Sequence, residues 1–236
     1  MSIQSQIHKF GATILQNLPD VSEDVMQSWI ENPRTLQKLL AGLCPPVNGP
    51  RTVNLDWAKV YEALGTEYDS EIASLAIAEQ EDLWTVPVIK GLTCNKVVAG
   101  LRNMGVKVYT YIDDLDENIT VNDRDPNRDG SYTVSFHSNV EADEENRSQS
   151  ANQRKEKGCK DITLLERLLL ELAYFLSTGK HLDEENWTLC AGSRSFVGRV
   201  PSVFWLSDSH KVYVSWYFSG IRDRYLRARS VVSLPV

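Results

Sequence analysis

The segment DITLLERLLLELAYFLSTGKHLD, residues 161–183, constrains the fold more than any other part of the sequence. Its apolar positions leave few polar interruptions, which is typical of a helix buried in a protein core. Thr163 and Glu166 have the spacing of a capping box, and Gly179 can end the helix in the left-handed conformation. We therefore expect a central core helix around which a domain packs.

The first 85 residues contain short amphipathic helical patterns. Ser22 can cap one helix, Asn32-Pro33 can begin a second, and further patterns cover 55–64 and 71–79. The stretch PPVNGP, residues 45–50, would stop the second helix and act as a hinge. A helix-turn-helix would fit this spacing, but there is no basic recognition helix, which favours a small helical bundle or arm.

The character of the sequence changes near Trp84, where short runs rich in β-branched and aromatic residues begin. The runs TVPVIKG, VKVYTYIDDLD (106–116) and GSYTVSFHS (130–138) predict strands, with a helical piece over 95–103. A polar, charged helix or helix-loop follows over 140–158. The second half is therefore expected to be mixed, α+β, with a strand-rich tail that starts at NWTLC (186–190).

No set of residues has the spacing of a catalytic or metal site. The four histidines fall in unrelated elements, and the four cysteines form no C-x-x-C pair, so buried free thiols are expected. The loop NDRDPNRDG resembles part of a calcium loop, but position twelve, which should be a bidentate Glu, is Phe136. Asp125, Asn127 and Asp129 therefore predict an Asx turn that leads into a strand. We expect no catalytic residue, no metal and no cofactor.

Charge and targeting signals are sparse. No apolar run approaches the roughly 18 residues of a membrane span, and the start MSIQSQIHKF lacks the order of a secretory signal, so a cytoplasmic protein is expected. The net charge of −7 divides into −12 over residues 1–190 and +5 over 191–236. A basic tail could suit a nucleic acid or an acidic partner. Because its six arginines are dispersed, it could equally be an ordinary surface, and we do not expect a nucleic acid as partner.

Alternation in the tail separates two faces of a hairpin. Val203, Trp205, Val212, Val214 and Trp216 share a face that has the composition of a core, whereas the opposite face mixes Ser, Phe and Tyr. Tyr, Ser, Phe, Arg and Gly are typical of adaptable binding surfaces. The alternative is that the N-terminal helices cover this second face.

The tail also contains no Glu, Gln or Met, all of which occur upstream. Together, the order of GSYTVSFHS, a polar helix, ITLLERLLLELAYFL, NWTLCAGSR, GRVPSVFW, KVYVSWY and YLRARSVVS resembles a C-type lectin-like domain. More narrowly, it resembles the variable proteins of diversity-generating retroelements of phages, bacteria and archaea. In that family, chosen codons near the C-terminus vary because a reverse transcriptase copies a template with errors at adenines.

The resemblance implies a helical N-terminal region over 1–85 and a C-type lectin-like domain over 86–236, with a variable region at about 191–236. Randomised AAC-type codons cannot give Glu, Gln, Met, Lys or Trp, so Trp205, Lys211 and Trp216 would be fixed. The implied function is recognition of a protein or another macromolecular ligand of unknown identity, without enzymatic activity and with specificity altered by diversification. The alternatives are an enzyme on the scaffold of formylglycine-generating enzymes, although the tail lacks the cysteine pair, and a non-diversified interaction or regulatory protein. The expected ligand-binding residues are Ser195, Phe196, Val197, Arg199, Ser202, Phe204, Asp208, His210, Tyr213, Ser215, Tyr217, Phe218, Arg222 and Asp223.

Overall fold

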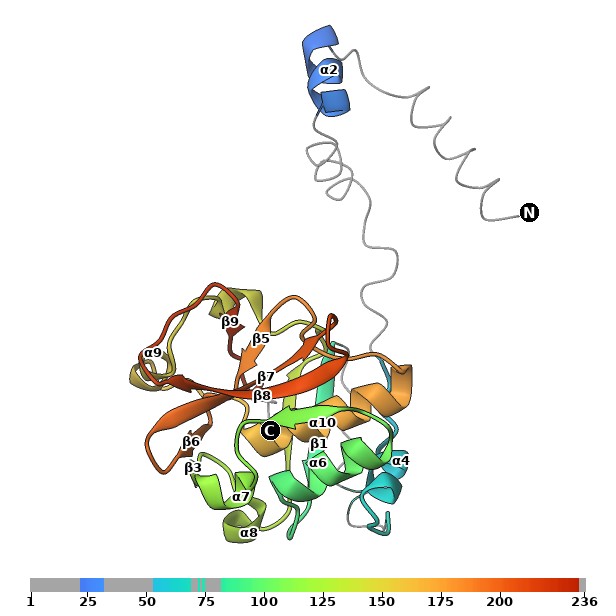
Figure 1. Cartoon of the computed structure of the whole chain (residues 1–236), viewed down its shortest axis with the longest axis vertical. Coiled ribbons are helices and arrows are strands. Elements are labelled where there is room, and N and C mark those ends of the chain that lie inside the picture. Colours follow the sequence, from blue (N-terminus) through green and yellow to red (C-terminus); the bar gives the residue numbers. More distant parts are fainter. Residues whose placement is uncertain (1–21, 32–52, 69–71, 73, 75–81, 234–236) are drawn as a thin grey trace, which may run out of the picture. The chain divides into compact units, whose positions relative to one another are not determined.

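The computed structural model describes residues 22–31, 53–68, 72, 74 and 82–233. The chain divides into two compact units, residues 1–49 and 50–236, whose elements are labelled in Figure 1. The described part of the first unit is α2 (Glu23–Glu31), which begins after Ser22 as the sequence predicts. The other helices expected before residue 50, the hinge over 45–50 and most of the helix expected over 71–79 lie outside the described residues.

The second unit is built around the long apolar helix. This helix, α10 (Leu164–Thr178), packs against α6 (Cys94–Asn103) and α4 (Trp57–Ala63), with strands on another side (Figure 1). Both hydrogen bonds of the capping box between Thr163 and Glu166 are present, and Gly179 has a φ of 69°. The predicted core helix is therefore confirmed. The sequence placed a domain boundary at residue 85, whereas the structure groups α4 with the strands and helices that follow it.

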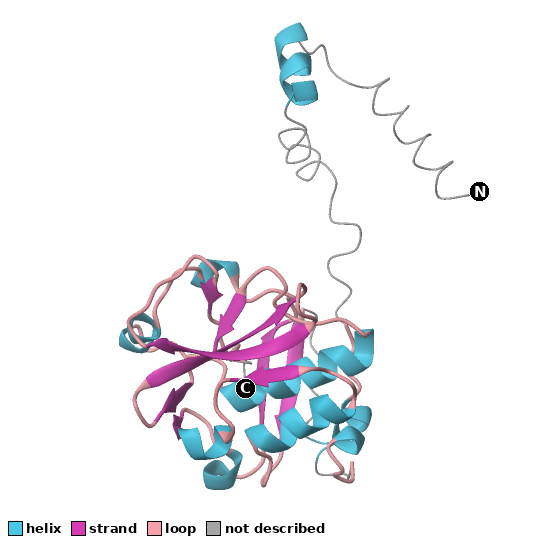
Figure 2. Ribbon diagram, in the orientation of Figure 1, coloured by secondary structure: helices cyan, strands magenta, loops and turns pink. Residues whose placement is uncertain are grey.

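The described strands of this unit form three sheets (Figure 2). The strand β1 (Leu83–Val88) pairs antiparallel with β4 (Tyr132–His137), and β3 (Ile119–Asn122) pairs antiparallel with β6 (Ser193–Ser195). The largest sheet is mixed, since its two outer pairings are parallel. Its order is β2 (Val108–Thr110), β8 (Lys211–Phe218), β7 (Arg199–Leu206), β5 (Trp187–Leu189) and β9 (Leu226–Arg227). The predicted α+β class is confirmed.

The connections contain short helices. They are α7 (Leu115–Asn118), α8 (Pro126–Asp129), η1 (Glu144–Asn146) and α9 (Ala151–Glu156). The polar segment expected to be helical over 140–158 thus forms two short pieces. Asp125 caps α8 by accepting a hydrogen bond from the Asn127 N–H at 2.8 Å, which confirms the expected Asx turn.

A cluster of fully buried charges lies where α10 meets the tail. Arg167 donates to Glu171 at 2.8 Å and, through its Nε, to Asp183 at 2.9 Å. Arg229 donates to the second oxygen of Asp183 at 2.7 Å, and Thr188 is hydrogen-bonded to the same carboxylate. All four charged side chains have 0% exposure, and their two positive and two negative charges balance. The segment that precedes the tail, at Asp183 and Thr188, and the end of the tail, at Arg229, are therefore tied to the central helix.

Candidate functional site

Aromatic side chains line up across the outer face of the five-stranded sheet. The strand register places Tyr213 opposite Phe204 on β7 and opposite Tyr109 on β2. The rings of Phe204 and Tyr213 are nearly parallel, with centroids 5.5 Å apart, and Tyr109 lies 5.2 Å from Tyr213. On the other side, Trp187 of β5 stacks on Phe204 at 4.8 Å. Four strands thus contribute one ring each to a continuous line.

Further rings extend the line at both ends. Tyr111, after β2, meets Tyr109 edge to face at 4.9 Å, and Tyr225 of the loop after β8 and Tyr217 of β8 stack on Trp187 at 5.3 Å and 6.1 Å. Tyr111 is the most accessible ring, at 63% exposure, whereas Trp187, Phe204, Tyr213 and Tyr217 are half-buried. Rings at these separations stabilise one another by about 0.5–1.5 kcal/mol per pair. We call the following seven residues the aromatic row: Tyr109, Tyr111, Trp187, Phe204, Tyr213, Tyr217 and Tyr225.

The inner face of the same strands is part of the main core. Val203, Val212 and Val214 are fully buried there, and Trp205 and Trp216 pack against the core from its edge. Trp205 also stacks on His181 with ring centroids 3.5 Å apart. The predicted division of the hairpin into a core face and an outer face is therefore confirmed, and the outer side chains are held on a packed sheet.

Part of the outer face is covered by the tail itself. A second apolar cluster joins Val200 and Leu189 of the sheet to Ala151 of α9 and Leu226 of β9. Ser202 lies between Leu189 and Ser215 in the register and is fully buried. We therefore correct the expectation for Ser202, which is not positioned to contact a ligand because neighbouring strands and side chains enclose it.

The remaining expected binding residues fall into separate groups. Asp208 and His210 lie in the turn between β7 and β8, at one end of the hairpin. Phe196, Val197, Arg199 and Phe218 are exposed at the other end, and the buried Ser195 accepts a hydrogen bond there from the Arg199 N–H at 3.0 Å. The structure thus does not bring the turn residues together with the others.

Arg222 and Asp223 belong to the loop that follows β8. The Arg222 side chain donates to the Ser148 carbonyl at 2.9 Å, and the Asp223 carboxylate accepts from the Tyr225 N–H at 2.8 Å. These bonds hold the loop that carries Tyr225 against the segment before α9. Burial raises the pKa of the neighbouring Tyr217 phenol, and the Asp223 carboxylate raises it further, so Tyr217 is neutral at physiological pH.

Two arginines lie over aromatic rings at the border of the hairpin. The Arg199 guanidinium is 4.7 Å from the centre of the Phe218 ring, and that of Arg224 is 4.6 Å from the Tyr225 ring. Such contacts orient the planar guanidinium and leave its edge available for hydrogen bonds. The border is therefore positively charged, in agreement with the charge of the tail.

The N-terminal helices were the alternative cover for this face. The described helix of 50–85, α4, instead packs on α10, and its Tyr61 donates to the Pro87 carbonyl at 2.7 Å. Among the described residues of the second unit, the cover comes from α9 and the chain after β8. Helix α4 therefore does not cover the outer face of the hairpin.

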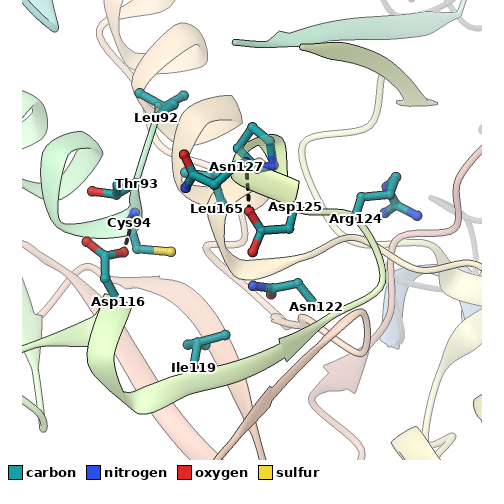
Figure 3. Close-up of a pocket in the computed structure, with 11 residues that line it drawn as sticks. Leu92, Thr93, Cys94, Asp116, Ile119, Asn122, Arg124, Asp125, Asn127 and Leu165 are labelled. Atoms are coloured by element: carbon teal, nitrogen blue, oxygen red, sulfur yellow. Dashed lines mark hydrogen bonds between the residues drawn. The ribbon is translucent and has the colours of Figure 1, made fainter. Parts of the chain in front are cut away.

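A small pocket of about 100 Å³ lies at the start of α6 (Figure 3). The Asp116 carboxylate accepts hydrogen bonds there from the N–H groups of Cys94 and Asn95 at 2.7 Å and 3.2 Å. Burial raises the pKa of the Cys94 thiol well above its usual value, and Asp116 raises it further, so the thiol is protonated at neutral pH. Thr93 is the N-cap of α6, Asp116 satisfies the first two N–H groups of that helix, and Cys94 has the properties of a buried structural thiol.

Four members of the aromatic row are absent from the sequence-based set: Tyr109, Tyr111, Trp187 and Tyr225. The spacing of Tyr109 and Tyr111 in VYTYI puts both on one face of a strand, and this signal was available. The parallel pairing of β2 with β8, which brings Tyr109 beside Tyr213, joins segments about a hundred positions apart and has no local signature.

No described helix is long and apolar enough to cross a membrane, and the described residues contain no group of three or more His, Cys, Asp or Glu side chains that could hold a metal ion. Neither a family model, nor a curated protein, nor a solved structure matches the chain.

Proposed function

We propose that this chain is a ligand-recognition protein whose second unit is a C-type lectin-like domain and whose tail, residues 191–236, is diversified by a retroelement. The observation that carries the proposal is the aromatic row. Rigid aromatic side chains supply contact area at a low cost in conformational entropy, and they dominate the energetics of many interfaces. A row of rings on the outer face of a sheet whose inner face is core is suited to binding.

The distribution of residue types supports diversification. Trp205 and Trp216, which adenine-directed variation of AAC-type codons cannot produce, belong to the inner face. Phe204, Tyr213, Ser215 and Tyr217, which it can produce, belong to the outer face. Variation at the outer positions would change the ligand while the core stayed intact.

Sequencing the DNA beside the gene tests diversification directly. We expect a template repeat and a reverse transcriptase gene, with mismatches confined to template adenines and concentrated in the codons of the outer residues. The codons of Val200, Leu226 and Arg229, which are buried, should match the template. A missing repeat, or mismatches in those buried codons, would refute diversification.

Binding by the aromatic row has a separate test. The full chain and its Phe204→Ala/Tyr213→Ala variant are applied to peptide and glycan arrays, with Val121→Ala, at an exposed position of β3, as control. Loss of a central aromatic anchor costs at least about 2 kcal/mol, which corresponds to about thirtyfold in affinity. Equal binding by the double variant and the wild type to every ligand would contradict a role for the row, whether or not the tail is diversified.

A further inference from the structure

A larger pocket, of about 410 Å³, opens beside β8 where that strand loses its neighbour. The strand β2 pairs with Val212–Val214 only, and Ser215 and Trp216 follow in the wall of the pocket. Phe196, its neighbours Ser195 and Val197, and Tyr111 also line the pocket. Pockets that hold small ligands have volumes of about 300–1,000 Å³. We call this space the edge pocket.

Two buried polar atoms on residues that line the edge pocket have no hydrogen-bond partner. They are Oδ1 of Asn118, an acceptor, and Nε1 of Trp216, a donor. Asn118 is 9% exposed. Its backbone carbonyl accepts from the Phe196 N–H at 3.0 Å, which holds Asn118 beside Phe196. A buried polar group without a hydrogen-bond partner is destabilising, so a ligand that supplies one donor and one acceptor would satisfy both atoms.

Arg199 brings a positive charge to the same pocket. Its guanidinium lies on Phe218, and no carboxylate of the described residues forms an ion pair with it. In the β7–β8 register Arg199 is opposite Phe218, so Trp216 is its diagonal neighbour on the same face, roughly 7–8 Å away. A carboxylate bound between them would accept from the guanidinium and from the indole N–H.

The rest of the wall is apolar and accessible. Phe196 is 68% exposed, Val197 is 61% exposed and Tyr111 is 63% exposed, and all three line the pocket. Large apolar side chains that gather in the open commonly mark a binding site. An apolar group of a ligand would be buried against them.

We infer that the edge pocket binds a carboxylate that carries an N–H donor and an apolar side chain, as in the C-terminal residue of a peptide or in a free apolar amino acid. The carboxylate faces Arg199 and the Trp216 N–H, the ligand N–H donates to Asn118 Oδ1, and the apolar side chain lies on Phe196 and Tyr111. This inference rests on the proposed recognition function and names a ligand class for a pocket at the end of the hairpin that carries Phe196 and Arg199.

The pocket also divides into a fixed floor and a changeable rim. Asn118 lies outside the tail, and Trp216 is of a type that the proposed diversification does not produce. Phe196, Val197 and Arg199 are of types that it does produce. The floor would therefore recognise the N–H and an oxygen that all C-terminal residues share, while the rim would select the side chain.

Isothermal titration calorimetry with the full chain tests the inference, using N-acetyl-L-leucine as probe and N-acetyl-L-leucinamide as the ligand without a carboxylate. We expect the acid to bind about tenfold or more tightly than the amide, because a hydrogen bond to a charged group is stronger than one to a neutral group. A pentapeptide ending in leucine and free L-leucine distinguish the two sources. Tighter binding of the peptide identifies a C-terminus, and tighter binding of leucine identifies the free amino acid.

Variants connect binding to the pocket. Arg199→Gln and Trp216→Phe should each weaken binding of the acid about tenfold, whereas Arg224→Gln, which removes the other ring-stacked arginine, should leave it unchanged. Arg199 is exposed, so its variant remains informative if Trp216→Phe does not fold. Equal affinity for acid and amide, wild-type affinity of the Arg199→Gln variant, or no binding at about 10 mM ligand would overturn the inference. If the arrays still show ligands that need Phe204 and Tyr213, the proposed function stands without it.

Discussion

Asp183→Asn should destabilise the second unit more than most single substitutions. The carboxylate lies between Arg167 and Arg229, and all three side chains have 0% exposure. The amide has nearly the same shape but no charge, so Glu171 remains to balance two buried arginines. Breaking a buried ion pair from one side costs about 3–5 kcal/mol, a large part of the 5–15 kcal/mol that stabilises a typical domain. At about 2–4 °C per kcal/mol, the melting temperature should fall by about 6–20 °C.

The acid dependence of this difference has a defined sign. Burial alone would raise the pKa of Asp183, but Arg229 and Arg167 hold it below its usual value. The stabilisation by Asp183 is therefore complete above the unfolded pKa of about 3.9 and is lost as the pH falls through the lower folded pKa. The stability difference between wild type and variant should be constant near neutral pH and should shrink only below about pH 4.

Urea unfolding followed by circular dichroism measures both effects. Lys59→Gln is the control, because its ion pair with Asp56 at 3.0 Å is exposed, and removing it should cost at most about 1 kcal/mol. Arg229→Met combined with Asp183→Asn restores charge balance with Arg167 and Glu171, so the double variant should lose less than the sum of the single variants. A loss below about 1 kcal/mol for Asp183→Asn alone would refute the reasoning that Asp183 offsets the buried arginines.

Three further predictions concern the two faces of the hairpin, the start of the tail and the thiols. Val214→Ala, in the core face, should lower the free energy of unfolding by about 1.5–3 kcal/mol. Ser215→Ala, at the next position on the outer face, should change it by less than about 0.5 kcal/mol. Equal losses in the two variants would contradict the division into two faces. Gly192→Ala should cost about 1–3 kcal/mol because a Cβ would come within 2.6 Å of the Asp161 carbonyl oxygen, and wild-type urea stability would rule this contact out. Cys94 and Cys190 are buried, and burial raises the pKa of both thiols. Mass spectrometry after thiol labelling at neutral pH should therefore find them modified only when the protein unfolds. Rapid labelling of either thiol in the native protein would disprove its burial.

Local patterns in the sequence were sufficient to predict several elements of this fold. The capping box of Thr163 and Glu166, the terminal Gly179 and the leucines between them identify α10 because helix caps and apolar periodicity act within a few residues. The alternation around Val203 and Val214 identified the inner face for the same reason. These signals depend on near neighbours, which a single sequence contains.

Long-range pairings were not predictable in this way. The sequence shows Arg167 and Glu171 only as polar positions within an apolar helix, because Asp183 and Arg229, which complete their cluster, are brought to them by tertiary packing. Ser202 has the same alternation as Phe204, but its position between Leu189 and Ser215 encloses it. The edge pocket likewise depends on where β2 ends beside β8, which no local pattern records.

The two ends of the β7–β8 hairpin lie far apart. Its strands have eight residues each, and at about 3.3 Å per residue the turn with Asp208 and His210 lies roughly 23 Å from the end that carries Phe196 and Phe218. Under the proposed recognition function, a ligand shorter than this distance would reach one end only and would leave the other open to a second molecule. The tail would then be a two-valent surface, on which a substitution at one end changes binding there without disturbing what binds at the other.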